Sequence, residues 1–299
     1  MKINQEMKRK IVQVAAFGYS NTYIGNFVSG QIYKGSWKQF CNPGMNCYSC
    51  PAARLACPIG AMQAVSGSMN FKLSFYVIGF VLALGVVFGR AICGFFCPFG
   101  LIQELIYKIP FPKKKLWKWL TYVKYVLLAV FVVIMPVTMV NELGMSSPAF
   151  CEYICPAGTL EGGIPLLSTH PELRATLGAL FSVKACILII TLIGCLSVCR
   201  FFCKVMCPLG AIYGLLNKVS IYYMECNKKT CVSCGKCHNI CPMDVGPVKN
   251  PNSAIVNPTD NASMDVAIPC SINTAKLNFF TSSISSSPFT DSHIMLPPI

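Results

Sequence analysis

Cysteine dominates the chemistry available to this sequence. Of its 299 residues, 19 are cysteine and 20 are proline. Random placement would give about one Cys-Pro dipeptide, whereas six occur. They begin at Cys50, Cys57, Cys97, Cys155, Cys207 and Cys241. Because Cys-Pro closes the cluster motifs of bacterial ferredoxins, this pattern indicates iron–sulfur ligands.

The most specific motif lies at residues 231–242 and reads C-x2-C-x2-C-x3-C-P. Its candidate ligands to a 4Fe-4S cluster are Cys231, Cys234, Cys237 and Cys241. The same stretch contains Cys-Gly-Lys-Cys-His, which alone would indicate covalent haem attachment. A cluster accounts for four cysteines and the proline, so we favour the cluster.

A second pattern, Cys-x-x-x-Cys-Pro-x-Gly, is repeated along the chain. It occupies residues 93–100, 151–158 and 203–210, and a modified copy at residues 41–60 has wider spacings. Cysteines four apart lie on one face of a helical turn. The proline then prevents regular helix from continuing, and we expect the glycine to let the chain turn away.

Each unit supplies two thiolates, so units must combine to bind a four-iron cluster. We expect one site to contain Cys93, Cys97, Cys203 and Cys207. The other site would contain Cys151 and Cys155 with Cys41, Cys47, Cys50 and Cys57, two more than one cluster requires. Three alternatives stay open: buried packing cysteines, disulfides among the last six, and bound Zn²⁺ or Cu⁺. We interpret Cys186, Cys195 and Cys199 as packing residues.

These units require elements that place them at a membrane surface. The chain is 54% hydrophobic and 12% charged, with a mean hydropathy of +0.54. Residues 11–33, 73–89, 120–140 and 177–198 each approach the ~20 residues of a membrane span. The first is interrupted by polar residues, and we expect it to be a retained helix rather than a cleaved signal peptide. The fold class is therefore mainly α, a polytopic membrane protein with about four transmembrane helices.

Basic residues predict the orientation of these spans. Seventeen lysines and arginines lie in the N-terminus, the second loop and the segment after the last span, against four in the other two loops. The richer side should be cytoplasmic. We expect a multi-pass protein of the cell inner membrane, with clusters on opposite faces, most of a ~30 Å core apart, and an intermediate carrier between them. Topology explains the net charge of +14, so no nucleic-acid partner is expected.

Three regions follow: residues 1–219 as the membrane domain, 220–252 as a ferredoxin-like segment in the cytoplasm, and 253–299 as a disordered tail. The tail is rich in serine, threonine and proline, with a lone Cys270. No P-loop, dinucleotide fingerprint or Ser/His/Asp pattern is visible in the sequence. Glu104 is the one acid that we would test for proton coupling.

The sequence resembles NapH-type membrane-bound 4Fe-4S polyferredoxin-like proteins, related to the membrane iron–sulfur parts of nitrous-oxide-reductase regulators and cytochrome-oxidase accessory proteins. The resemblance covers roughly residues 11–254 through PGMNCYSCP, ACPIGA, CGFFCPFGLIQE, YICPAGTLEGGIP, CKVMCPLGA and the ferredoxin motif. Family members commonly carry a second ferredoxin motif where this chain has its tail. That departure leaves the ferredoxin-like cluster in need of a fourth ligand from Cys226, Cys241 or Cys270.

The resemblance implies two or three 4Fe-4S clusters that carry electrons between a quinol or low-potential donor and a partner reductase. We expect an electron-transfer subunit of an oxidoreductase rather than a stand-alone enzyme, with membrane lipid, a partner redox subunit and a quinone as candidate partners. The alternative is a membrane redox sensor or metal-site assembly factor that uses the same clusters.

Overall fold

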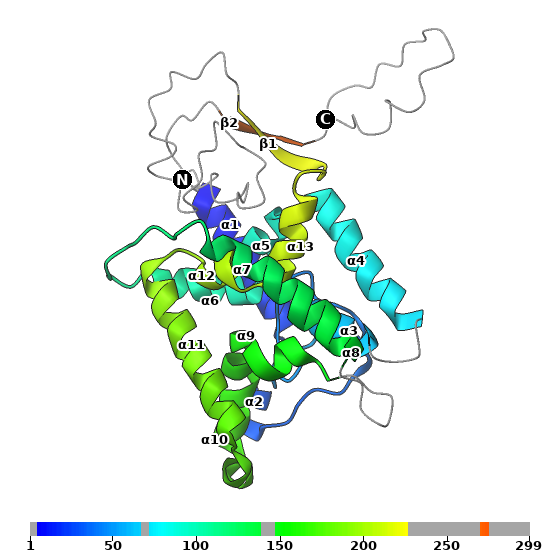
Figure 1. Ribbon diagram of the computed structural model, residues 1–299, viewed down its shortest axis with the longest axis vertical. Helices are drawn as coiled ribbons and strands as arrows, with labels where there is room; N and C mark the ends of the chain where they lie inside the picture. Colours follow the sequence, from blue (N-terminus) through cyan, green and yellow to red (C-terminus); the bar gives the residue numbers. More distant parts are fainter. Residues whose placement is uncertain (1–4, 67–71, 139–146, 227–269, 275–299) are drawn as a thin grey trace.

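The described part of the chain is mainly helical. This computed structural model describes residues 5–66, 72–138, 147–226 and 270–274 (Figure 1). The α-helices are α1 (Gln5–Ser20), α2 (Asn26–Ser29), α3 (Pro58–Ser66), α4 (Lys72–Phe88), α5 (Ala91–Phe95), α6 (Pro98–Tyr107), α7 (Leu120–Leu127), α8 (Met135–Thr138), α9 (Pro156–Gly158), α10 (Ile164–Thr169), α11 (Ala179–Ser197), α12 (Phe201–Val205) and α13 (Pro208–Leu216). Short 3₁₀ turns are η1 (Ser36–Gln39) and η5 (Pro171–Thr176), and π-helical turns are η2 (Leu128–Ile134), η3 (Phe150–Ile154) and η4 (Thr159–Gly163).

Two strands form an antiparallel pair, β1 (Tyr222–Cys226) with β2 (Cys270–Thr274). The register sets the backbone of Cys226 opposite that of Cys270. The five residues of β2 fall within the segment predicted to be a disordered tail, and that assignment stays a prediction. The predicted ferredoxin motif, with Cys231, Cys234, Cys237 and Cys241, lies outside the described residues.

Two continuous helical stretches in the described residues have the length and apolar composition of a membrane span, Leu120–Thr138 and Ala179–Ser197. A third apolar helix, Phe75–Phe88, is shorter. The predicted span at residues 11–33 is not confirmed, because α1 ends at Ser20 and polar turns follow it. About four transmembrane helices therefore remains a sequence-based prediction.

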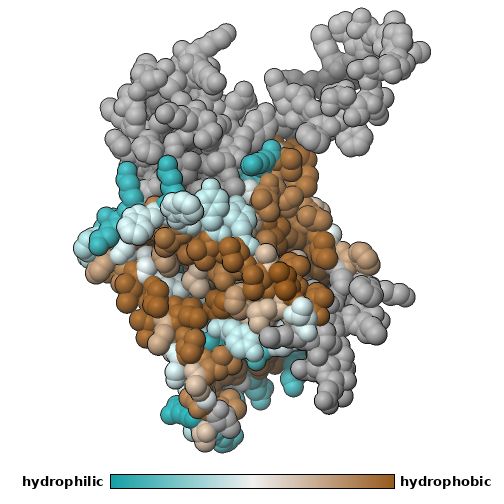
Figure 2. Space-filling view, in the orientation of Figure 1, coloured by the Kyte–Doolittle hydropathy of each residue, from teal (hydrophilic) through white to brown (hydrophobic). Residues whose placement is uncertain are grey.

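The two long apolar stretches expose hydrophobic side chains rather than burying them. Val133 and Val137 on one, and Ile190 and Ile193 on the other, are more than half exposed. Figure 2 shows hydrophobic residues across the middle of the molecule and hydrophilic ones toward its lower end and upper left. Such a distribution suggests membrane association, because a water-exposed surface rarely carries apolar patches this extended.

Four of the Cys-Pro pairs begin a helix, those at Cys57, Cys97, Cys155 and Cys207. Cys97, Cys155 and Cys207 have non-helical backbone with ψ near 110°, and the proline after each is the first residue of α6, α9 or α13. Proline is favoured at the first position of a helix because its fixed φ matches helical backbone. The N–H that it lacks would make no hydrogen bond within the helix at that position. The expectation that the glycine lets the chain turn away is wrong. At Gly158 and Gly210 the helical N–H instead donates to the sulfur of the same unit's second cysteine, three residues earlier, at 3.3 and 3.2 Å.

The four units meet in one hydrophobic core. α13 packs against α3, α4 and α7, while α11 packs against α6, α9 and α12. In Figure 1, α5, α6, α12 and α13 lie in the upper half of the molecule and α3, α9 and α10 in the lower half. Buried Ile59, Ile92, Phe150 and Phe202 fill the space between the units. The core therefore places cysteines from distant parts of the chain together.

Candidate functional site

One group of four thiols, here called the second cysteine site, contains Cys93, Cys97, Cys203 and Cys207. They come from α5, the start of α6, α12 and the start of α13. Burial raises the pKa of the Cys207 thiol well above its ordinary value, and the nearby thiols of Cys203, Cys93 and Cys97 raise it further. The structure thus brings together the four cysteines expected to share a site. Their role as iron ligands stays a prediction.

Three buried cations surround the second cysteine site. Burial raises the pKa of the Cys93 thiol to about 11, while Arg90, Arg200 and Lys124 lower it. The Arg90 guanidinium donates to the Gly210 carbonyl at 2.9 Å. Lys124 is 1% exposed, and no described carboxylate pairs with it. Because a buried charge without a counter-charge is costly, this surrounding suits an anionic occupant.

The other group, the first cysteine site, contains Cys47, Cys57, Cys151 and Cys155. Burial raises the pKa of the Cys155 thiol well above its ordinary value, and the thiols of Cys151, Cys47 and Cys57 add to the shift. Cys57 precedes α3, and the pair Cys151 and Cys155 flanks the turn before α9. A modified unit and a regular unit together therefore provide four thiols.

The first cysteine site carries a buried carboxyl group. The Cys47 backbone N–H donates to Oε2 of Glu161 at 2.9 Å, and Oε1 has no hydrogen-bond partner among the described residues. Burial raises the pKa of Glu161 to about 7, although the Cys47 amide lowers it. The Lys184 ammonium group donates to the Cys151 backbone carbonyl at 3.2 Å. The two sites therefore differ in the charges around them.

Two expected members of the first site lie at its margin. Cys50 packs with Ala52, Ala53 and Cys47, and its thiol donates to the side-chain amide oxygen of Asn21 at 3.9 Å. The backbone of Cys41 forms an isolated bridge with Ala56. Burial and then the Cys57 thiol raise the pKa of Cys41 to about 11. The structure thus divides the six expected cysteines into four that gather and two at the margin.

The loop at residues 41–47 touches both sites. Gly44 lies against Cys97 of the second site, and Cys47, three residues further along the loop, belongs to the first site. A Cβ added at Gly44 would lie 2.5 Å from the Cys97 Cα, so only glycine permits this close approach. In the same loop, the sulfur of Met45 lies 3.5 Å from the sulfur of Cys207.

This contact corrects the expected separation of the two sites. The contact of Gly44 with Cys97 sets their Cα atoms at most ~4 Å apart, and three residues of chain span at most ~11 Å. The Cα atoms of Cys47 and Cys97 therefore lie within roughly 15 Å of each other. Separation by most of a bilayer core, with a carrier between the sites, is wrong because the loop folds back between the units.

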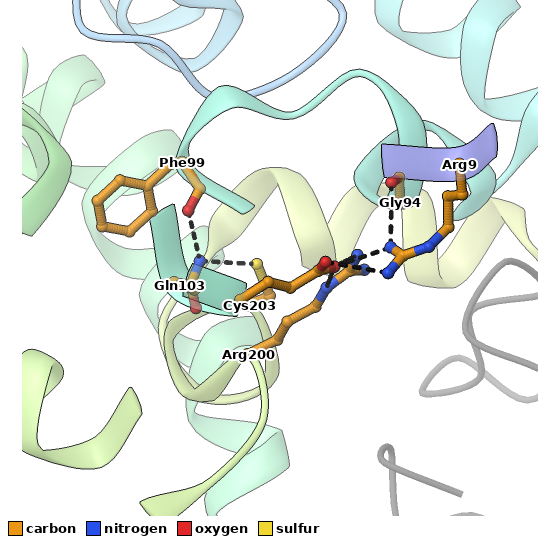
Figure 3. Close-up of polar contacts among 7 residues, drawn as sticks. Arg9, Gly94, Phe99, Gln103, Arg200 and Cys203 are labelled. Atoms are coloured by element: carbon orange, nitrogen blue, oxygen red, sulfur yellow. Dashed lines mark hydrogen bonds and ion pairs between the residues drawn. The ribbon is translucent and has the colours of Figure 1, made fainter. Parts of the chain in front are cut away.

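Glu104 is held by two arginines beside the second site (Figure 3). Arg9 of α1 donates to both carboxylate oxygens at 2.9 and 3.0 Å, and Arg200 donates to Oε1 through Nε at 2.9 Å. Burial raises the pKa of Glu104, but Arg200 and Arg9 outweigh it and hold the pKa below its usual range. The carboxylate is therefore a structural anion joining α1, α6 and the start of α12, and the proton-coupling hypothesis loses its motivation.

The donor sets fit 4Fe-4S clusters in number and in kind. Each cluster takes four thiolates, one on each iron, and each site gathers four thiols. Within the described ranges no three His, Cys, Asp or Glu side chains are arranged to hold a single metal ion. Ligands of a single metal ion all meet at that ion. The four thiolates of a 4Fe-4S cluster each bind a different iron and therefore lie farther apart.

Two cysteines on α11 belong to neither site. Cys186 is exposed, and Cys195 is buried with its thiol directed at the side-chain amide oxygen of Gln103, 3.7 Å away. Sequence reasoning did not single out Gln63, Gln103 or Glu161. The available signal was their shared place, six residues after a Cys-Pro cysteine.

A family model described as a 4Fe-4S binding domain matches three times, at residues 73–118, 124–168 and 180–221. Each match spans one apolar helix and one Cys-x-x-x-Cys-Pro unit. The repeated domain and the many cysteines indicate multiple 4Fe-4S clusters in this protein.

The similarity to curated relatives extends over more of the chain than the three domain matches do. An uncharacterized protein of Methanocaldococcus jannaschii is 31% identical over 191 residues, which cover 60% of this chain and 69% of the relative. YccM of Escherichia coli, assigned by name to electron transport, is 26% identical, with coverage of 59% and 46%. The methylamine utilization ferredoxin-type protein MauN of Methylorubrum extorquens is 27% identical, with coverage of 54% and 50%. The chain spans about half the length of these last two, and no solved structure matches.

Proposed function

Because this chain belongs to the polyferredoxin-like family of 4Fe-4S binding proteins, we propose that it relays electrons between two clusters held in one helical core. The ligands would be the four thiols of each cysteine site. A 4Fe-4S cluster supplies one-electron chemistry with little structural change. Two relatives named for electron transport and as a ferredoxin-type protein support this function.

The observation that carries the proposal is the loop shared by the two sites. Gly44 packs against Cys97 of the second site, and Cys47, three residues later, belongs to the first site. Such contacts hold the sites at a fixed, short separation and allow direct transfer without a carrier between them. The surrounding core excludes water, since Cys97, Cys155 and Cys207 are each at most 6% exposed.

The cations give the relay a direction. Arg90, Lys124 and Arg200 surround the second site, and positive charge stabilises the additional electron of a reduced cluster. The electron should therefore rest at the second site. Burial also favours a relay over a redox sensor, because a sensor needs a labile cluster that solvent can reach.

For the wider setting, we propose the cell inner membrane, with the second site and the ferredoxin-like segment toward the cytoplasm. A quinol or low-potential donor and a partner reductase would lie at the two ends of the relay. Support comes from the two apolar helical stretches and from the excess of basic residues on one side.

Electron paramagnetic resonance on anaerobically purified protein tests the relay. We expect brown protein whose broad absorbance falls on reduction with dithionite. Full reduction should give broadened, interacting signals, because two paramagnetic clusters held by cysteines within roughly 15 Å of each other couple magnetically. Sharp, independent signals would contradict the short separation. Colourless protein with stoichiometric zinc would contradict the function itself.

Thiol labelling tests the orientation. In a Cys186→Ala background, we expect a membrane-impermeant reagent to modify Glu172→Cys in intact cells. Lys115→Cys should react only after permeabilisation, because it lies in the basic loop that is expected on the cytoplasmic side. Both positions are exposed, and the background variant alone gives the unmodified reference. The opposite pattern would invert the orientation, and equal labelling of both would contradict the spanning arrangement.

A further inference from the structure

In the four Cys-Pro pairs that begin a described helix, the residue six positions after the cysteine is polar and buried. These residues are Gln63, Gln103, Glu161 and Tyr213, with exposed fractions of 0, 1, 9 and 0%. Four buried polar side chains at one position of a repeat need a common explanation, because burying a polar group is unfavourable unless it is bonded.

Helix geometry explains why this position faces the thiols. The proline starts the helix, so the glycine three residues after the cysteine and the residue six after it lie on one face. Glycine leaves room beside the sulfur: a Cβ at Gly100 or Gly210 would lie 3.4 Å from its unit's cysteine Cβ. The longer side chain one turn later reaches past that glycine.

Gln63 and Gln103 make the same two donor contacts in different sites. Each amide Nε2 donates to the carbonyl four residues earlier, at 3.2 Å for Gln63 and 3.3 Å for Gln103. Each also donates to the first cysteine of the partner unit, Gln63 to Cys151 at 3.5 Å and Gln103 to Cys203 at 3.2 Å. Figure 3 shows Gln103 between Phe99 and Cys203.

The remaining amide atom fixes the orientation. The Phe150 backbone N–H donates to Oε1 of Gln63 at 2.8 Å, and the Cys195 thiol lies 3.7 Å from Oε1 of Gln103. A flipped amide would set an N–H against a donor and the oxygen against the cysteine sulfur. The nitrogen therefore faces the sulfur in both sites.

We infer that Gln63 and Gln103 are positioning residues that raise the reduction potentials of the first and second cluster, respectively, by donating an N–H to one ligand sulfur. The inference rests on the proposed function. A cluster gains one electron on reduction, with no proton or bond exchanged, and the sulfurs carry part of the added charge. An N–H directed at a sulfur stabilises that charge, and hydrogen bonds to the sulfurs are known to set cluster potentials.

Redox titration of full-length protein, followed by electron paramagnetic resonance, provides the test. Gln103→Met keeps the length of the side chain and removes both N–H donors. We expect full iron content, a more negative midpoint for the second cluster and an unchanged first cluster. Gln63→Met should do the reverse. Gln103→Glu also lacks the donor and should shift the second cluster in the same direction.

Gln13→Met is the matched control, since Gln13 is 1% exposed on α1 and its amide has no partner among the described residues. It should leave both midpoints unchanged. Unchanged midpoints in the Gln63 and Gln103 variants would overturn the inference, as would loss of iron in both Gln103→Met and Gln103→Glu, which indicates a purely structural role. Wild-type protein without iron and sulfide would instead refute the proposed function.

Discussion

Cys203→Ser is expected to remove the cluster of the second site while the first site keeps its own. Soft thiolate is the ligand that iron–sulfur clusters select, and the serine oxygen is a poor substitute. Cys93→Ser should abolish the same spectroscopic signal, because both thiols belong to one group of four. Each variant should lose one cluster's iron, together with the magnetic interaction between clusters.

Three other cysteine variants serve as controls, because they should retain the clusters. Cys186 is exposed on α11 and belongs to neither site, so Cys186→Ser should retain all iron. Cys41→Ser and Cys50→Ser should also retain both clusters, since these cysteines lie at the margin of the first site. If Cys93→Ser and Cys203→Ser removed two different signals, the grouping would be wrong. Loss of the first cluster in Cys50→Ser would place that thiol among its ligands.

Glu104→Gln should destabilise the protein by about 3–5 kcal/mol, the usual cost of leaving a buried charge without its partner. Arg200 is 1% exposed and Arg9 is 7% exposed, so neither guanidinium can recover full hydration in place. Arg200 also has a φ of 52°, a strained value for a residue other than glycine, and its contact with Glu104 helps hold it there. Since Cys203 follows Arg200 by three residues, the second cluster should also become labile.

Denaturant titration in detergent, followed by cluster absorbance, measures this effect. Glu172→Gln changes an exposed acid and should alter stability by less than about 0.5 kcal/mol. Arg9→Met leaves the contact between Glu104 and Arg200 in place and should cost less than Glu104→Gln. A loss below about 1 kcal/mol for Glu104→Gln would mean that water reaches the arginines.

Local chemistry was readable from the sequence because it depends on neighbours along the chain. The six Cys-Pro pairs and the repeated spacing pointed to 4Fe-4S clusters, which the repeated domain match confirms. Proline at the first helical position explains why helices begin after Cys97, Cys155 and Cys207. The apolar stretches at residues 120–140 and 177–198 correspond closely to helical segments of span length. The interrupted stretch at residues 11–33 does not, because polar turns follow Ser20.

What only the tertiary structure decided is which distant groups meet. Spacing alone could not divide Cys41, Cys47, Cys50 and Cys57, because a loop of irregular backbone can present any of them. Glu104 was judged from its neighbours in sequence, while its partners lie 95 and 96 residues away. The short separation of the sites likewise depends on the loop at residues 41–47 folding between units that begin fifty or more residues later. The sequence by itself thus determined the donors and their local geometry, whereas long-range packing in a shared core decided their grouping, their charges and their separation.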